Sequence, residues 1–224
     1  MRYGRGTFGR LRKHSMPESD SKLTADGLAM RYGRRVLFRD LSFEVAPGAP
    51  LAITGRNGAG KSTLLKILAG VLEPINGTVK LVDEGKEVKD ELRPHSVGFV
   101  APYLHLYAPF SARENLAFLA QARRLSDRQA RIYEVLDRVG LLERAEDHLS
   151  TYSTGMRQRL RIAAALLHDP PLLLLDEPSA TLDESGRELA ESIIGMNEKI
   201  IVIATNDPDE AALCATRLHL ETNP

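Results

Sequence analysis

Residues 55–63 have the sequence Gly55-Arg56-Asn57-Gly58-Ala59-Gly60-Lys61-Ser62-Thr63, which matches the pattern G-x-x-x-x-G-K-[ST]. In this pattern, glycines let backbone N–H groups turn inward around bound phosphates. An apolar run from Pro50 to Thr54 precedes the loop, and Lys61 to Ala69 has the spacing of an amphipathic helix. The stretch therefore predicts a short strand, a phosphate-binding loop and a helix whose positive N-terminal end faces an anion.

Individual residues of this loop have expected contacts with a nucleotide and its metal. Lys61 would reach the β- and γ-phosphates, and the Ser62 hydroxyl would ligate Mg²⁺. The alternative, a glycine-rich turn without a ligand, would leave a lysine buried without an anion, which is costly. We therefore expect ATP and Mg²⁺ as cofactors. The residues expected to bind the nucleotide here are Gly55, Asn57, Gly58, Gly60, Lys61, Ser62 and Thr63.

A second candidate group follows a run of four leucines, Leu172 to Leu175. Asp176 and Glu177 come directly after it, and a parallel sheet places such a strand end at the ligand crevice. We expect Asp176 to hold Mg²⁺, usually through water, and Glu177 to polarise the attacking water. The alternative is a solvated helix N-terminus with two exposed acids, which the presence of a phosphate loop disfavours.

The rest of the chain alternates strand-like and helix-like segments, which predicts an α/β architecture. Continuous apolar runs such as Ile200 to Ala204 are typical of a parallel sheet covered on both faces. Residues 21–32 are expected to form an edge strand. Residues 111–168 contain no convincing strand and are expected to be a helical insertion. Within it, we expect helices around 113–124, 127–139 and 155–167.

Composition narrows the class of protein. Formal net charge is zero, so no nucleic-acid partner is expected. The single cysteine, Cys214, fits a reducing compartment, and the apolar runs are shorter than the roughly 20 residues that cross a bilayer. Residues 1–20 are expected to be a disordered basic extension. A basic arm for phosphate or anionic lipid, and a true start at Met16, are the alternatives.

Beyond these two motifs, the chain resembles the nucleotide-binding subunits of ABC transporters over about residues 22–222. Residues 152–159 (YSTGMRQR) are similar to the signature segment of that family, and residues 179–183 (SATLD) are similar to its dimer-interface loop. The resemblance implies that Ser153 and Gly155 bind the γ-phosphate held by another subunit. It also implies that Asp183 belongs to the nucleotide site and that Tyr32 stacks on adenine.

The resemblance implies one domain over 21–222. This domain would have a P-loop core with a mainly parallel sheet, an N-terminal antiparallel β subdomain and a helical subdomain inserted at about 104–168. Two subunits, identical or different, would close head to tail over two ATP molecules. Hydrolysis would then drive a membrane-spanning permease subunit. The expected location is cytoplasmic, peripheral on the inner face of the cell membrane.

Three positions depart from the family pattern. Pro102, followed by Tyr103, stands where the family has a glutamine, and proline has no N–H to donate. Asn206 replaces the switch histidine, so its amide can donate a hydrogen bond but cannot carry a proton. Thr154 replaces a glycine of the signature. Because Lys61 and Glu177 are retained, we predict intact nucleotide binding with slow hydrolysis, and we expect Glu177, Lys61 and Asn206 to be the catalytic residues.

The kind of transporter follows less directly from the sequence. The short C-terminal part and residues 35–43 (RVLFRDLSF) look similar to haem-exporter ATPases of cytochrome c maturation. The signature that begins at Tyr152 also looks similar to multidrug-type exporter ATPases. The alternatives are a soluble ABC-type ATPase and a regulatory nucleotide binder with slow hydrolysis.

Overall fold

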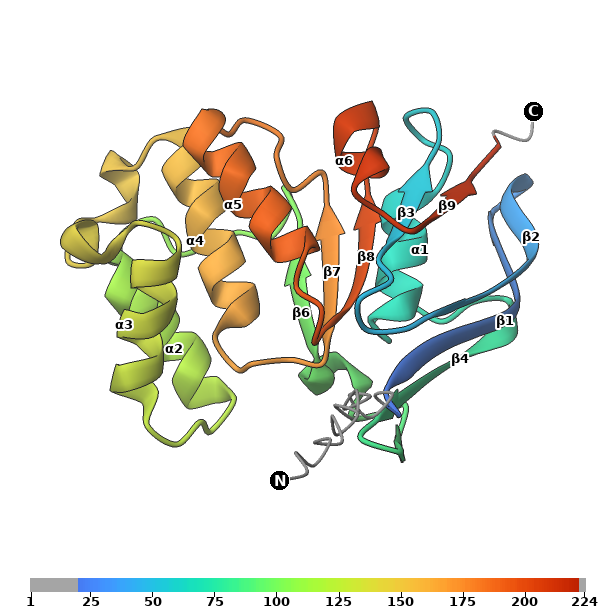
Figure 1. Ribbon diagram of the computed structural model, residues 1–224, viewed down its shortest axis with the longest axis horizontal. Helices are drawn as coiled ribbons and strands as arrows, with labels where there is room; N and C mark the ends of the chain where they lie inside the picture. Colours follow the sequence, from blue (N-terminus) through green and yellow to red (C-terminus); the bar gives the residue numbers. More distant parts are fainter. Residues whose placement is uncertain (1–19, 222–224) are drawn as a thin grey trace, which may run out of the picture.

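The computed structural model describes residues 20–221 and contains two β-sheets (Figure 1). The first is antiparallel, with strand order β2-β1-β4-β5, and matches the expected β subdomain. Its strands are β1 (Lys22–Tyr32), β2 (Arg35–Val45), β4 (Asn76–Asp83) and β5 (Lys86–Val88). The expectation that β1 is an edge strand is wrong. The chain forms β3 and α1 before it returns as β4. Strand β4 then pairs with the edge of β1 opposite β2, with Leu23 facing Leu81.

The second sheet is parallel, as predicted, with strand order β6-β7-β8-β3-β9. Its strands are β6 (Val97–Val100), β7 (Leu172–Asp176), β8 (Ile200–Ala204), β3 (Leu51–Thr54) and β9 (Thr216–His219). Every residue of β7 and β8 is buried, which explains their continuous apolar runs. Because all five strands run the same way, the ends of β3 and β7 lie at one edge of the sheet (Figure 1).

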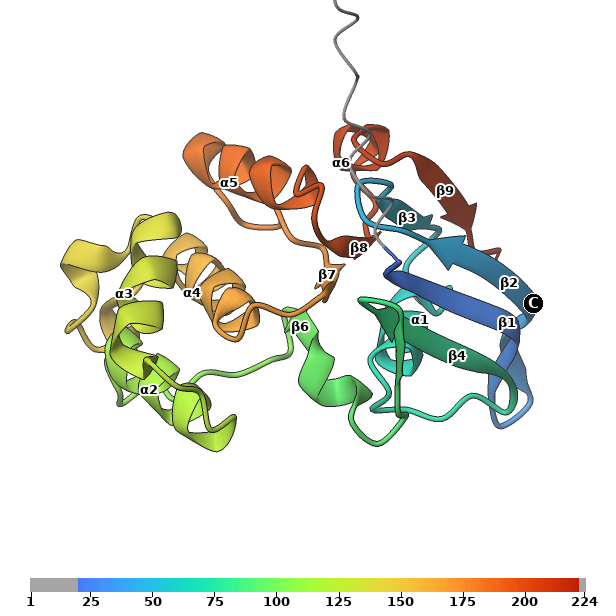
Figure 2. The same ribbon diagram turned by 60° about the horizontal axis from the view of Figure 1, so that its bottom comes forward.

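Helix α1 (Lys61–Leu68) packs between the two sheets. Its residues Leu64 and Leu65 are fully buried and share one core cluster with Leu23 of β1 and Val202 of β8. Gly70, at φ +74°, follows the helix and ends it as the sequence predicts. Figure 2 shows α1 beneath the antiparallel sheet, with the helical part of the molecule on the opposite side of β6 and β7.

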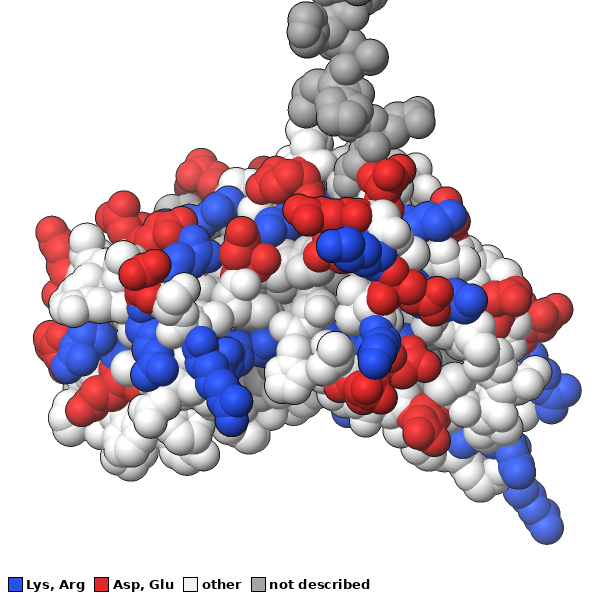
Figure 3. Space-filling model, turned by 90° about the horizontal axis from the view of Figure 1, so that it is seen from below, with Lys and Arg blue, Asp and Glu red and all other residues white. Residues whose placement is uncertain are grey.

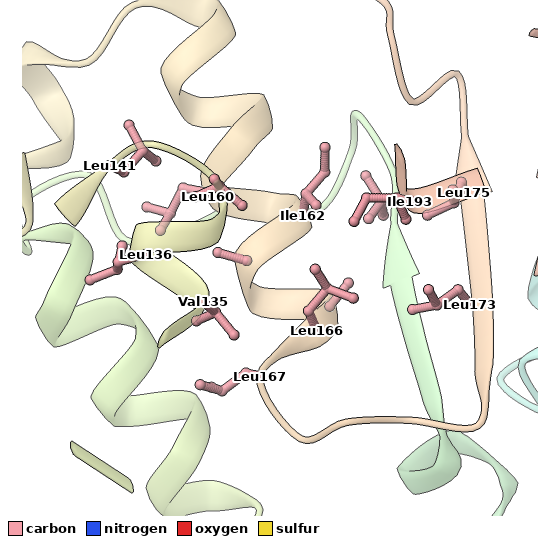
Figure 4. Close-up of a cluster of buried hydrophobic side chains, with 14 of the residues drawn as sticks. Val135, Leu136, Leu141, Leu160, Ile162, Leu166, Leu167, Leu173, Leu175 and Ile193 are labelled. Carbon is pink, nitrogen blue, oxygen red and sulfur yellow. The ribbon is translucent and has the colours of Figure 1, made fainter. Parts of the chain in front are cut away.

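Three helices form the predicted insertion: α2 (Ala112–Ala122), α3 (Arg128–Arg138) and α4 (Thr154–Leu166). Leu136 and Leu160 of this block share a continuous core with Leu173 and Leu175 of β7 (Figure 4). Between β6 and β7 the structure shows an isolated bridge, Ser111 to His148, and no strand of either sheet. The insertion is therefore packed on the parallel sheet through a shared core.

Several elements were not predicted from the sequence. They are the 11-residue helix α5 (Glu184–Ile194) and the short elements α6 (Pro208–Ala212), β5, and 3₁₀ turns at Arg93–Ser96, Leu142–Arg144 and Leu149–Thr151. Within residues 20–221, none of the helices combines the length and apolarity that a membrane span requires. The expected basic extension lies almost entirely outside the described residues. On the face shown in Figure 3, acidic and basic side chains are interspersed rather than separated by sign.

Candidate nucleotide-binding site

The phosphate loop joins β3 to α1 and has a backbone that requires glycine. Gly55 has φ +141°, and a Cβ there would lie 2.4 Å from the backbone oxygen of Leu220. Gly60 has φ +104°, and its carbonyl accepts the first helical hydrogen bond, from the N–H of Leu64 at 2.8 Å. The loop thus leads directly into a helix N-terminus, the arrangement that favours a bound anion.

Lys61 lies in this loop with only 7% of its surface exposed. Its Nζ donates to the Gly55 carbonyl oxygen at 2.7 Å and to Asn206 Oδ1 at 2.9 Å. Both acceptors are neutral, so these contacts orient the ammonium group without neutralising it. A buried cation held in this way is a site for an anionic ligand.

Asp176 ends β7 and is 4% exposed. Burial raises the pKa of its carboxyl group, while a hydrogen bond with Ser62 and the charges of Lys61 and Lys66 oppose this shift. Ser62 and Asp176 thus bring two hard oxygen ligands together. No cluster of three or more His, Cys, Asp or Glu side chains suited to a metal occurs among residues 20–221. A pair of protein oxygens fits Mg²⁺, which takes its other ligands from phosphate and water.

Glu177 follows in a left-handed conformation, φ +49°, stabilised by a 2.8 Å hydrogen bond from its N–H to the Ala204 carbonyl. A non-glycine residue in this region is uncommon and often belongs to a functional site. Burial raises the pKa of Glu177, whereas the hydrogen bond from Asn206 and the charge of Lys61 lower it. The carboxyl group therefore has a higher proton affinity than an exposed glutamate, which suits a general base.

Asn206 connects the two halves of the site. Its Nδ2 donates to Asn57 Oδ1 at 2.8 Å and to Glu177 Oε1 at 3.1 Å, while its Oδ1 accepts from Lys61. One amide thus bridges the phosphate loop and the carboxylate at the end of β7. The structure places the predicted residues Lys61, Glu177 and Asn206 within a single hydrogen-bonded group.

A cleft of about 570 Å³ lies beside the loop, and the predicted residues Gly55 and Asn206 do not line it. Of the predicted residues, Tyr32, Asn57, Gly58, Gly60, Lys61, Ser62, Thr63, Asp176 and Glu177 line it. Tyr32 is 54% exposed at its mouth, as an aromatic stacking platform requires. Pro102 and Tyr103 also line the cleft, so the departure from the glutamine pattern lies in its wall.

Arg35 and Leu37 also line this cleft and were not predicted from the sequence. Arg35 pairs with Tyr32 across the β1–β2 hairpin, and its Nη2 donates to the Gly58 carbonyl at 2.8 Å. The available signal was the two-residue spacing Gly33-Arg34 between two strands, which brings positions 32 and 35 together.

Ser153, Gly155 and Asp183 do not line this cleft. Ser153 caps α4 by accepting from the Met156 N–H at 3.1 Å, and Asp183 caps α5 while pairing with Arg159 at 2.6 Å. In Figure 1 the starts of α4 and α5 lie at the same edge of the molecule as the phosphate loop, but apart from it. The chain therefore does not bring its signature segment to its own phosphate loop.

Comparisons with known proteins agree with this geometry. The ABC transporter family model matches residues 38–180. The lipoprotein-releasing system ATP-binding protein LolD of Protochlamydia amoebophila is 34% identical over 195 residues, covering 82% of this chain and 86% of the relative. The ABC transporter ATP-binding protein YxlF of Bacillus subtilis is 41% identical over 155 residues, covering 68% of this chain and 51% of the relative.

Solved structures match as well. The dimeric structure of the bacterial ABC transporter cassette MJ0796 superposes with a TM-score of 0.77 at 25% identity, covering 89% of this chain and 94% of that chain. The matched part of the chain spans about half the length of the Bacillus subtilis relatives, 49% to 51%. On the family match, the LolD relative and the shared fold, this chain belongs to the ABC transporter ATP-binding family, a family of ATPases.

Proposed function

We propose that this chain is the ATP-binding and slowly ATP-hydrolysing subunit of an ABC transporter. The observation that carries the proposal is the convergence of Lys61, Ser62, Asp176 and Glu177 on one cleft, with Asn206 bonded to both sides of it. A cation, a pair of metal-binding oxygens and a carboxylate of raised pKa are the groups that phosphoryl transfer to water needs.

In this proposal each group has a separate task. Tyr32 stacks on the base, and the backbone of residues 55–63 surrounds the phosphates, with Lys61 balancing their charge. Ser62 and Asp176 hold Mg²⁺, which supplies charge neutralisation at the phosphate oxygens when bound. Glu177 orients a water and accepts its proton.

Slow hydrolysis follows from the two departures around the cleft. Pro102 lines it without a backbone N–H or a polar side chain. Asn206 occupies the switch position with an amide that neither binds nor releases a proton. The general base Glu177 and the phosphate-binding Lys61 remain in place. We therefore expect nucleotide binding to be retained and stabilisation of the transition state to be reduced.

The cleft is proposed to be half of a site, completed by a second ATPase subunit of the same or a different kind. Ser153 and Thr154 are exposed at the start of α4, and no residue of that segment lines the chain's own cleft. An exposed helix N-terminus is suited to the γ-phosphate of a neighbouring subunit. The solved cassette described above as dimeric supports this arrangement.

A membrane-spanning permease is the second proposed partner. Tyr107, Phe110 and Phe118 form an exposed aromatic patch, with Tyr107 5.7 Å from Phe110 and 5.6 Å from Phe118 between ring centroids. Next to it lies a groove of about 310 Å³, here called the side groove, whose lining includes Phe99, Leu104, Leu106, Arg123 and Arg161. Exposed apolar patches of this kind mark interaction sites. We assign them to a cytoplasmic segment of the permease.

The transported substrate is set by the permease. The relatives are named for lipoprotein release, linearmycin resistance and aliphatic sulfonate import, so their names do not favour haem over other substrates. The second candidate function is a soluble regulatory nucleotide binder. Pro102 and Asn206 favour it, because a binder does not need the groups that these positions have lost.

A pull-down from detergent-solubilised membranes of the source cell separates the two functions. The transporter proposal predicts that a polytopic membrane protein is recovered with the chain. Recovery should fall at least tenfold for Phe110→Ser combined with Phe118→Ser, while nucleotide binding is unchanged. The control is Leu213→Ser, at an exposed apolar residue that belongs to neither the aromatic patch nor the side groove. Recovery of soluble proteins alone would support the regulatory function and contradict the transporter.

A further inference from the structure

The segment after β6 forms the wall between two cavities. Pro102 and Tyr103 line the nucleotide cleft, whereas Leu104 and Leu106 line the side groove. Phe99 also lines the side groove, and its ring contacts that of Tyr103 edge to face, with centroids 6.2 Å apart and an interplanar angle of 82°. The Tyr103 ring is therefore supported from the groove side while it faces the cleft.

A second contact holds the same ring from α1. Lys66 Nζ lies 4.3 Å from the centroid of Tyr103, a cation–π distance. Lys66 is four residues after Ser62, so both lie on one face of α1, and its charge also acts on Asp176. Tyr103 thus has a ring held by two contacts, and it lines the same cleft as Ser62 and Asp176, whose oxygens are suited to Mg²⁺.

The hydroxyl of Tyr103 is available for hydrogen bonding as a neutral phenol. Burial, and then the charge of Asp176, raise the pKa of Tyr103, so the phenol stays protonated at working pH. A neutral hydroxyl donates one hydrogen bond and accepts others. Tyr103 and Asp176 line the same cleft, and the neighbouring Pro102 in its wall has no donor to offer.

We propose that Tyr103 is a positioning residue of the Mg²⁺–nucleotide site, with its ring fixed by Lys66 and Phe99 and its hydroxyl directed to the shell of groups around Asp176 and the metal. The proposal rests on the proposed nucleotide site and adds to it a residue that belongs to the metal side alone. We expect ATP without metal to contact the loop and Tyr32, and Mg²⁺ bound at Ser62 and Asp176 to change the surroundings of the Tyr103 ring in the same cleft.

The absence of tryptophan from the chain gives a clean optical test. Tyr103→Trp and, separately, Tyr32→Trp each introduce a single tryptophan at one wall of the cleft. Each variant is titrated with ATP in EDTA, and Mg²⁺ is then added in excess. We expect Trp emission at position 32 to change with ATP and little further with Mg²⁺. Emission at position 103 should change chiefly at the Mg²⁺ step.

Removal of the hydroxyl gives the second readout. Tyr103→Phe keeps the ring contacts, so we expect unchanged ATP affinity in EDTA and a half-saturating Mg²⁺ concentration about fivefold higher, the loss of one hydrogen bond. Tyr133→Phe, at a tyrosine outside both the cleft and the aromatic patch and as exposed as Tyr103, is the matched control and should leave both values unchanged.

Two results would overturn the role of Tyr103: Trp emission at position 103 that does not change with Mg²⁺, or equal Mg²⁺ requirements in Tyr103→Phe and Tyr133→Phe. A position 32 probe that ignores ATP is a different failure. It would contradict the nucleotide site itself, and with it the basis for this proposal.

Discussion

At the scale of single residues, Asn206 gives the clearest picture of how this site differs from its family pattern. A histidine there would change charge near neutral pH. The amide instead presents its oxygen to Lys61 and its nitrogen to Glu177 and Asn57, so it satisfies a cation and a carboxylate at once. The substitution keeps the residues positioned and removes a proton carrier. This combination is the residue-level reason to expect firm nucleotide binding with slow hydrolysis.

Asp176 gives the first prediction, which concerns stability and pH. Burial raises its pKa above the ordinary 3.8, so the folded chain binds a proton there more readily than the unfolded chain. Its ionised form therefore costs folding free energy, and the stability of nucleotide-free protein falls as pH rises from about 4 through the folded-state pKa. Asp176→Asn removes this cost. We expect a higher Tm at pH 7, by roughly 2–4 °C for each kcal/mol recovered, measured by differential scanning calorimetry.

The control is Asp183, whose pKa is shifted in the opposite direction from that of Asp176. The hydrogen bond from Arg159 lowers the pKa of Asp183, and Asp183 also caps α5. Asp183→Asn should therefore lower Tm, or leave it unchanged, at the same pH. A lower Tm for nucleotide-free Asp176→Asn than for the wild type would contradict the view that this carboxylate is held at a cost for a metal.

At the scale of elements, the β1–β2 hairpin is tied directly to the phosphate loop. Tyr32 and Arg35 face each other across its end, and Arg35 donates to the Gly58 carbonyl at 2.8 Å. The hairpin that carries the proposed base platform is thereby fixed relative to the loop that holds the phosphates. Orientation of one element by the other reduces the ordering cost of binding a nucleotide.

The second prediction tests this connection. Arg35→Ala removes one hydrogen bond to the loop, and we expect ATP affinity to fall about fivefold, close to 1 kcal/mol. Isothermal titration calorimetry measures the change. Arg34→Ala is the matched control, because Arg34 lies in the same turn and does not line the cleft. Equal affinities for the two variants would show that the hairpin and the loop act independently.

Element by element, the sequence predicts the strands of the parallel sheet and the three inserted helices well. Uninterrupted apolar runs and helical spacing are strong signals for β7, β8 and α4. The interior position of β1 could not be predicted, because pairing of β1 with β4 depends on a connection through α1 and not on the sequence of β1. Strand β5 and helix α6 are too short, at three and five residues, to show a period.

The site was predictable to the extent that it lies in contiguous motifs. Residues 55–63 and the pair Asp176 and Glu177 are visible in the sequence because each follows a buried strand. The place of Arg35 in the cleft is not visible, because it depends on the register of the β1–β2 hairpin. The ring contacts of Tyr103 are not visible either, because they join separate elements. Long-range contacts of this kind leave no local pattern.

At the scale of the whole molecule, the two proposed parts of the nucleotide site do not meet within one chain. The phosphate loop opens on the cleft, while Ser153 and Gly155 lie at the start of α4 and outside that cleft. Figure 1 shows both at one edge of the molecule, where a second subunit could cover them. We interpret this edge as the proposed face toward the partner ATPase subunit.

The third prediction follows from that separation. Gly155→Asp places a negative charge at the start of α4, and we expect the ATP affinity of the isolated chain to stay within about twofold of the wild type. If the chain pairs with itself, light scattering should show that Glu177→Gln associates in the presence of ATP and that adding Gly155→Asp abolishes the association. A large loss of ATP affinity in the isolated Gly155→Asp chain would mean that α4 contributes to its own cleft.

The central claim is that the cleft binds MgATP, with Lys61 contacting the phosphates, and hydrolyses it slowly, with Glu177 as the general base. The most direct measurement follows radiolabelled ATP on the purified chain, recording bound ATP and released ADP over time for wild type, Lys61→Ala and Glu177→Gln. We predict that the wild type binds ATP and turns it over below about 0.1 per second, against a typical enzyme value of roughly 10 per second. Binding should be lost in Lys61→Ala, and turnover alone should be lost in Glu177→Gln. Turnover near 10 per second in the wild type, or undiminished turnover in Glu177→Gln, would contradict the account.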